Sequence, residues 1–137
     1  MNFEEDFRAL LLDCAPLVAL VGQRVNWGEM PEAGALPRVT LWNVTRDANV
    51  TMQGPSGLVT PYLQVDCWAT SAAAAASLAD VVTTYLQSIM HQTEGATVFQ
   101  GCFLQGRRDS REPTLGAPAA RYARVGMDWT IQAGSAA

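Results

Sequence analysis

Residues 58–91 read LVTPYLQVDCWATSAAAAASLADVVTTYLQSIMH, and this stretch decides the fold. Its first part, Leu58–Ala69, alternates in the manner of a half-buried strand. One predicted face carries Val59, Leu63, Val65 and Cys67, and the other carries Thr60, Tyr62, Gln64, Asp66 and Trp68. Ser71 can then cap a helix from Ala72 to about His91. The apolar face of that helix comprises Leu78, Val81, Val82, Tyr85, Leu86 and Ile89. A strand that leads directly into an amphipathic helix predicts a sheet with the helix packed on one face.

The segments before this stretch predict a helix and a strand pair. Asn2 and Glu5 have the spacing of a helix capping box, and apolar residues follow from Phe3 to Cys14 at helical intervals. Pro16 to Leu20 predicts a short second helical turn that Gly22 ends. The predicted strands here are Val25–Trp27 and Arg38–Thr45. A loop over Asn49–Gly57 is expected, with Gly54-Pro55-Ser56-Gly57 as the tip of a hairpin.

The segments after the long helix predict a second strand pair, Ala96–Gln105 and Ala119–Ile131. Arg107–Pro118, which reads RRDSREPTLGAP, is polar and rich in turn-forming residues, so we expect a long loop. The whole order predicts an α+β fold: a mostly antiparallel sheet of four to five strands, with an N-terminal helix and one long helix on one face. We expect a single domain over residues 1–137, with the last few residues disordered.

Composition limits the classes of function. The chain has 137 residues, is 49% hydrophobic and 16% charged, and has a net charge of −4, which argues against wrapping nucleic acid through its phosphates. All nine basic residues are arginines, as codon bias or a preference for protein interfaces would produce. The widely spaced Cys14, Cys67 and Cys102 favour buried free thiols. Neither a signal peptide nor a membrane span is expected, so we predict a soluble protein made in the cytoplasm.

Candidates for catalysis or metal binding are few. His91 is the single histidine, and its predicted place at the end of the long helix favours a structural role. Asp66 in mid-strand could act as a general base, but a cross-strand pair with an arginine is the expected arrangement. Arg107, Arg108 and Arg111 form a basic cluster that Asp109 and Glu112 interrupt, which favours a protein interface or a solvated loop. The sequence therefore predicts neither catalytic, cofactor-binding nor metal-binding residues.

The order of these features resembles the tail-completion, or tail terminator, family of long-tailed phages, prophages and gene transfer agents. The likeness is strongest over Leu63–Ala69, which leads into Ala75–Val82. It extends to Phe7–Cys14, to Leu36-Pro37, to Gly54-Pro55-Ser56-Gly57 and to the ending Arg108-Asp109 through Asp128-Trp129-Thr130-Ile131. The Ala72–Ala76 run and Gly116-Ala117-Pro118 depart from the expected pattern.

The resemblance implies a virion protein, assembled in the host cytoplasm, that acts as a structural subunit and not as an enzyme. Such a protein forms a homohexameric ring on the last ring of tail-tube protein, ends polymerisation of the tube and joins it to the head connector or stopper. DNA only passes through the lumen of such a ring, and an acidic chain suits that passage. Head-side connector or adaptor rings of similar size are the nearest alternative, and a small enzymatic or ligand-binding domain is a third.

Two predicted loops are the candidate partner-contacting segments. The residues concerned are Asn49, Gly54, Ser56, Arg107, Arg108, Arg111 and Glu112. The arginines among them are the expected salt-dependent contacts.

Overall fold

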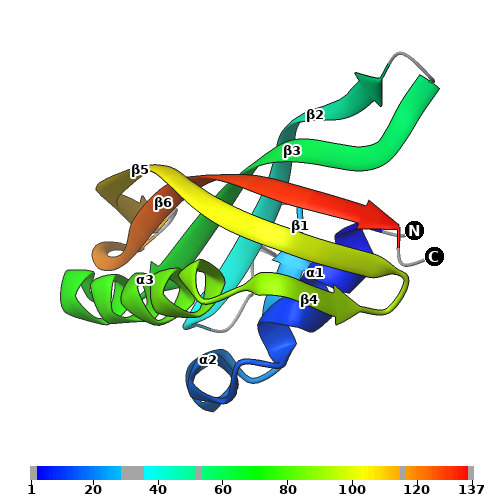
Figure 1. Ribbon diagram of the computed structural model, residues 1–137. Coiled ribbons are helices and arrows are strands. Elements are labelled where there is room, and N and C mark those ends of the chain that lie inside the picture. The colour runs from blue at the N-terminus through cyan, green and yellow to red at the C-terminus, as the bar shows by residue number, and fades with distance from the viewer. Residues whose placement is uncertain (1–2, 29–35, 52–53, 115–116, 136–137) are drawn as a thin grey trace.

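The computed structural model describes residues 3–28, 36–51, 54–114 and 117–135, and over 45–51, 54–58, 110–114, 117–122 and at 135 it describes the backbone alone. The described chain is an α+β fold, as predicted (Figure 1). Its elements in chain order are α1 (Phe3–Leu12), α2 (Ala15–Val21), β1 (Val25–Trp27), β2 (Arg38–Thr51), β3 (Gly54–Ala69), α3 (Ala72–Gln87), β4 (Met90–Glu94), β5 (Thr97–Thr114) and β6 (Ala117–Ser135). Asn2, the predicted cap of the first helix, lies outside the described residues.

The strands form one curled sheet in the order β1-β2-β3-β6-β5-β4. All neighbouring pairs are antiparallel except β1 and β2, which are parallel. Over the described residues the sheet has six strands, whereas four to five were predicted. The additional strand is β4, which lies at the sheet edge and pairs with β5 from Met90–Gly101 to Glu94–Thr97.

The predicted C-terminal end of the long helix was wrong. The helix ends at Gln87, and Ser88 is its C-cap, with the Ser88 hydroxyl donating to the carbonyl oxygen of Tyr85 at 2.6 Å. His91 therefore lies in β4 and not on a helix terminus, and its φ of +53° is incompatible with a continuing helix. Gly95, at φ +58°, turns β4 into β5, and a Cβ atom at this position would collide with the carboxylate of Asp6.

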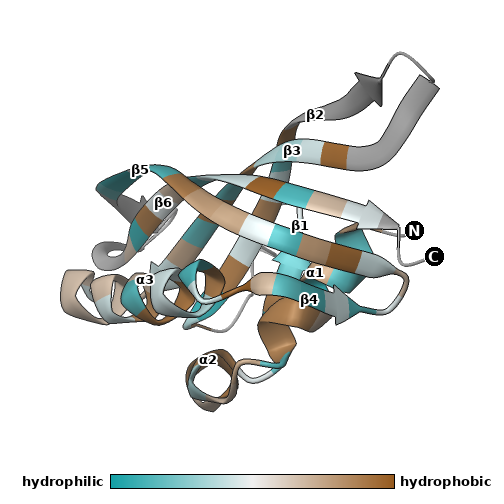
Figure 2. Cartoon of the chain, viewed as in Figure 1, coloured by the Kyte–Doolittle hydropathy of each residue, from teal (hydrophilic) through white to brown (hydrophobic). Residues whose placement is uncertain are grey.

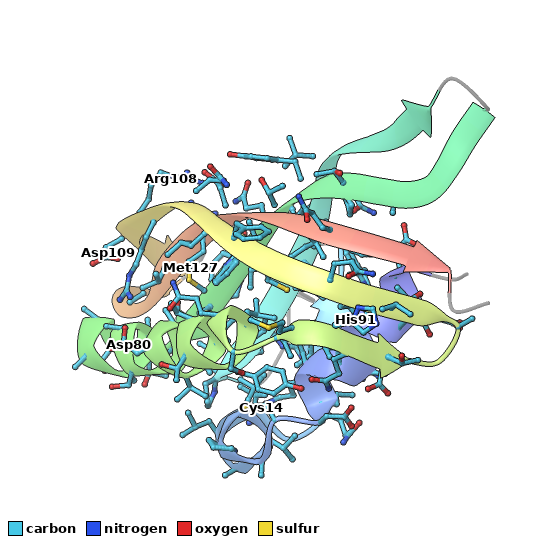
Figure 3. The ribbon with its side chains drawn as sticks, in the orientation of Figure 1. Cys14, Asp80, His91, Arg108, Asp109 and Met127 are labelled. Atoms are coloured by element: carbon cyan, nitrogen blue, oxygen red, sulfur yellow. The ribbon has the colours of Figure 1, made fainter. Side chains whose placement is uncertain are left out.

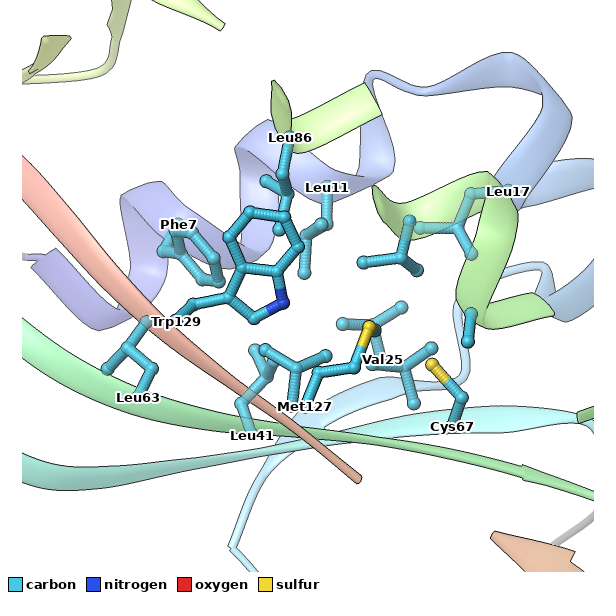
Figure 4. Packing of buried hydrophobic residues seen from close by; sticks show 14 of the residues in the cluster. Phe7, Leu11, Leu17, Val25, Leu41, Leu63, Cys67, Leu86, Met127 and Trp129 are labelled. Atoms are coloured by element: carbon cyan, nitrogen blue, oxygen red, sulfur yellow. The ribbon is translucent and has the colours of Figure 1, made fainter. Parts of the chain in front are cut away.

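The helices cover one face of the sheet, and the core lies between the two layers (Figure 1). The indole of Trp129 on β6 is fully buried, among Phe7 and Leu11 of α1 and Leu86 of α3 (Figure 4). A second group of rings holds α1 on the sheet: Phe3 and Phe7 stack at 5.7 Å, and both lie 5.9 Å from Phe99 of β5. Most residues of the predicted inward faces of β3, β6 and α3 are buried in this core, and Ala75 and Ala79 of α3 join it. Val59, Val81 and Tyr85 are partly buried and pack against it.

Both predicted long loops were wrong, because the strands continue through them. β2 runs to Thr51 and β3 starts at Gly54, so Gly54-Pro55-Ser56-Gly57 is strand and not a hairpin tip; Val50 pairs with Pro55 and Thr51 with Gly54. β5 likewise runs to Thr114 and β6 starts at Ala117. Before Leu58 on β3 and before Ala123 on β6, the described strands pair with one neighbour each, β3 with β2 and β6 with β5. We call these two-stranded ends the β2–β3 ribbon and the β5–β6 ribbon; the first projects away from the helices in Figure 1.

Candidate assembly surfaces

The sheet face opposite the helices, here the outer face, carries a row of apolar side chains that are exposed or half-buried. Phe103 of β5 pairs with Thr130 of β6, which pairs with Tyr62 of β3, so these three residues lie side by side. Trp42 and Phe103 are 42% and 48% exposed, and Met90 is 83% exposed. We call Trp42, Tyr62, Phe103 and Met90 the outer stripe. Single exposed apolar residues are ordinary, but a row across four strands indicates a surface that a partner covers.

A glycine shapes one end of the outer stripe. Gly101 pairs with Met90, and a Cβ atom at Gly101 would lie 3.1 Å from the Cζ of Phe103. The ring of Phe103 therefore lies over Gly101, close to Met90. Any side chain at position 101 would push this ring away from the sheet.

The other end of the outer face is polar and largely buried. Asp66 is 2% exposed, and the side-chain amide of Gln64 donates to its two carboxylate oxygens at 3.0 and 3.2 Å. Arg124 of β6 lies 4.0 Å from Asp66, as the predicted cross-strand pair requires, and its guanidinium lies 5.3 Å from the ring centroid of Trp68. Burial raises the pKa of Asp66, and the hydrogen bond from Gln64 opposes that shift. This group fixes β3 against β6 and gives no sign of catalysis.

The predicted basic cluster at the start of the β5–β6 ribbon is divided between the two faces of the sheet. The Nη1 of Arg107 donates to Asp80 of α3 at 2.8 Å, whereas the Nη1 of Arg108 donates to Asp128 at 2.6 Å on the outer face. Asp80 and Arg108 are labelled in Figure 3. Successive side chains of a strand point to opposite faces, so the two arginines cannot act together. The hydrogen bonds to Asp80 and Asp128 raise the pKa of Arg107 and Arg108 respectively.

The remaining predicted contact residues lie on the ribbons. Asn49 is in β2 at a register shift between Ala48 and Val50. Gly54 and Ser56 are in β3, and Arg111 and Glu112 of β5 pair with Ala123 and Tyr122. The structure thus places these residues on two separate extensions of the sheet, and the conformations of their side chains lie outside the described residues.

The helix layer contains a groove that sequence reasoning missed. It has a volume of about 520 Å³ and lies between the α1–α2 junction and the second half of α3. Its mostly apolar lining consists of Asp13, Cys14, Ala15, Pro16, Asp80, Val81, Thr84, Tyr85 and Ser88. Figure 2 shows α2 beside it as almost entirely apolar, and Leu20 of that helix is 42% exposed. The apolar run APLVALV of α2 indicated an apolar surface, but the sequence did not reveal which other elements would lie beside α2 and form the groove.

Two carboxyl groups meet close to this groove. A hydrogen bond with Asp13 raises the pKa of Glu94 to about 7, with smaller contributions from burial and from the charge of Asp13. Tyr85 lies close by and donates from its hydroxyl to the carbonyl oxygen of Leu10 at 2.7 Å. Glu94 belongs to β4, which was not predicted as a strand, so this proximity could not be inferred beforehand.

The remaining described candidates for catalysis or metal binding are one exposed histidine and three buried cysteines. His91 is exposed on β4, with Nδ1 3.0 Å from the Oε1 of Gln100. Cys14, Cys67 and Cys102 are buried free thiols, as predicted, and burial raises the pKa of Cys102 to about 12. Within the described ranges there is neither a group of three potential metal ligands nor a helix long and apolar enough to cross a membrane.

Comparisons with known proteins agree with this architecture. A family model described as tail completion protein gp17 matches residues 5–125. A search of curated proteins gives no match. Among solved structures, a chain from the "Virion of native gene transfer agent (GTA) particle" aligns with a TM-score of 0.67 and 18% identity, over 96% of this chain and 93% of that chain. At this identity the structural match shows a shared fold.

Proposed function

Because the chain belongs to the tail completion protein gp17 family, we propose that it ends the growth of a tail tube by forming a ring on the end of the tube. As a member of this family it is a structural component of the virion and not an enzyme, and it functions in tail completion. The finer proposal is a homohexamer with tail-tube protein on one side and a head connector or stopper protein on the other.

The observation that carries this proposal is the family match over residues 5–125, which includes the helices and most of the sheet. The two ribbons supply physical support. A two-stranded ribbon is marginally stable in water by itself, so extensions such as β2–β3 and β5–β6 gain stability when another protein covers them. A ring also requires heterologous contacts, in which two different surfaces of each subunit meet.

We propose that the ribbon residues make the contacts with tail and head proteins. The residues concerned are Asn49, Gly54 and Ser56 on the β2–β3 ribbon, with Arg111 and Glu112 on the β5–β6 ribbon. The paired Arg107 and Arg108 lie at the start of the second ribbon, where Arg107 ties it to α3. Arg108, whose side chain is 57% exposed, can still meet a partner.

The test is the native mass of the purified protein, alone and mixed with short tail-tube assemblies. We expect a six-fold ring that caps tube ends and stops their growth. A dodecamer that binds portal proteins and ignores tubes would favour the head-side connector role. A monomer that binds neither tubes nor connectors would contradict both roles.

A further inference from the structure

Two exposed apolar surfaces lie on opposite layers of this chain. The outer stripe crosses the sheet face that the helices leave open, and the groove beside α2 opens from the helix layer. Two different apolar surfaces on opposite layers of one subunit permit each copy to contact two others. Contact between like surfaces would stop at a dimer.

The charges of the two layers are complementary. On the helix layer, carboxylates outnumber arginines among the described residues: Glu4, Glu5, Asp6, Asp13, Asp80, Glu94 and Asp109 against Arg8, Arg24 and Arg107. On the outer face arginines outnumber carboxylates: Arg38, Arg108 and Arg124 against Asp66 and Asp128. A second copy that places its outer face on the helix layer therefore meets opposite charge, whereas two helix layers would repel each other.

The pair of carboxyl groups beside the groove strengthens this argument. Asp13 and Glu94 are close enough to share a hydrogen bond, and the hydrogen bond and charge of Asp13 raise the pKa of Glu94. An arriving arginine would relieve this repulsion, and arginine is the only basic residue type, apart from His91, that this chain carries. The apolar lining of the groove accepts aromatic side chains such as Phe103 and Trp42, whose exposed rings would leave water on contact.

From these observations we propose that the outer stripe of one subunit packs into the α2–α3 groove of the next, head to tail. The inference rests on the proposed function, because it identifies the surfaces through which the ring closes. The occupant of the groove is a second copy of this chain, and the ribbons remain free for tail and head proteins.

Crosslinking through paired cysteines tests this contact. Thr130→Cys places a thiol in the outer stripe, and Thr84→Cys places one in the groove; both replace a half-buried or exposed threonine. The background carries Cys14→Ala, because Cys14 lines the groove, while Cys67 and Cys102 are buried. The double-cysteine chain is treated with a short bis-maleimide after ring formation, alone and with tail-tube assemblies, and is separated under denaturing conditions.

We expect the double-cysteine chain to give a ladder of trimers and larger products. Each single-cysteine chain should stay monomeric, and an equal mixture of the two should stop at dimers. The matched control combines Thr130→Cys with Ala73→Cys, an exposed position at the far end of α3, and should give no ladder. Dimers from Thr130→Cys alone would reveal contact between like faces and overturn the proposal.

Native mass measured on the same samples separates the two proposals. A closed ring that gives no ladder overturns this contact and leaves the proposed function intact. A ladder without a closed ring supports the contact and contradicts the ring. If neither a ring nor a ladder forms with tubes present, both proposals fail.

Discussion

Reversing the charge of Arg107 would establish whether this residue serves the fold or a partner protein. Its guanidinium contacts Asp80 of α3 at 2.8 Å and lies 3.8 Å from Asp109 on its own strand. Arg107→Glu places a third carboxylate beside these two. The side chains of Arg107 and Asp80 are 31% and 69% exposed, so water screens the interaction and the pair contributes only about 0.2–1 kcal/mol.

The expected cost of Arg107→Glu is therefore about 0.4–2 kcal/mol, because an attraction is lost and a repulsion of similar size replaces it. For a chain of this length, that cost corresponds to a decrease in Tm of about 1–8 °C. Thermal unfolding followed by circular dichroism measures it. The matched control is the charge swap Arg107→Glu/Asp80→Arg, which re-forms the pair with its signs exchanged and should recover most of the lost Tm.

The second readout is the fraction of tail tubes that the variants cap. If the swap restores both stability and capping, Arg107 acts by holding the β5–β6 ribbon to α3. If it restores stability and capping stays low, Arg107 contacts a partner directly, as its sequence context suggested. If the swap leaves the Tm as low as in Arg107→Glu, the ion pair does not hold the ribbon and the reasoning is wrong.

Three further predictions concern stability. Trp129→Phe removes a buried indole N–H that has no hydrogen-bond partner among the described atoms. In urea unfolding it should therefore lower the free energy of unfolding by well under the roughly 3–5 kcal/mol expected of Trp129→Ala. Equal losses in the two variants would show that the N–H is satisfied. Arg124→Leu leaves the buried Asp66 without its nearest cation and should lower the free energy of unfolding by about 1–3 kcal/mol. Adding Asp66→Asn should recover most of that loss. If the two changes are strictly additive in a double-mutant cycle, the pairing is contradicted. The pKa of Glu94 is raised to about 7 by Asp13, so the folded chain retains a proton that the unfolded chain releases from about pH 4.5 upward, and stability should decline as pH rises from about 4.5 to 7. Glu94→Gln should flatten that decline, by less than about 1 kcal/mol because the group is near the surface, and an unchanged pH profile would refute the assignment.

Local sequence patterns were sufficient to predict the layers of the fold. Alternation in β3 and β6 identified the inward residues, such as Val65 and Met127, because burial on one face of a sheet enforces a period of two. The helical spacing of apolar residues in α3 likewise predicted which of its residues face the core, because burial of one helix face enforces a period of 3.6. The free thiols and the pairing of Asp66 with an arginine also followed from residue type and context.

The strand lengths could not be predicted, because cross-strand pairing decides them and local propensity does not. Gly54, Pro55 and Ser56 are turn-forming residues, yet they lie opposite β2 in a ribbon. β4 was missed because its residues, Met90 to Glu94, are mostly polar and it lies at a sheet edge. The groove depends on where α2 meets α3, a long-range arrangement that no local pattern encodes.

The position of β6 has a consequence for synthesis on the ribosome. β6 is the last of the six strands in sequence, yet it lies in the middle of the sheet between β3 and β5. Until it emerges, the segment that ends with β3 and the segment that contains β4 and β5 have no shared strand, and the aromatic anchor Trp129 is missing from the core. A nascent or truncated chain therefore cannot present a finished subunit surface. We therefore expect a chain truncated before β6 to lack both the continuous sheet and the buried core of the intact subunit.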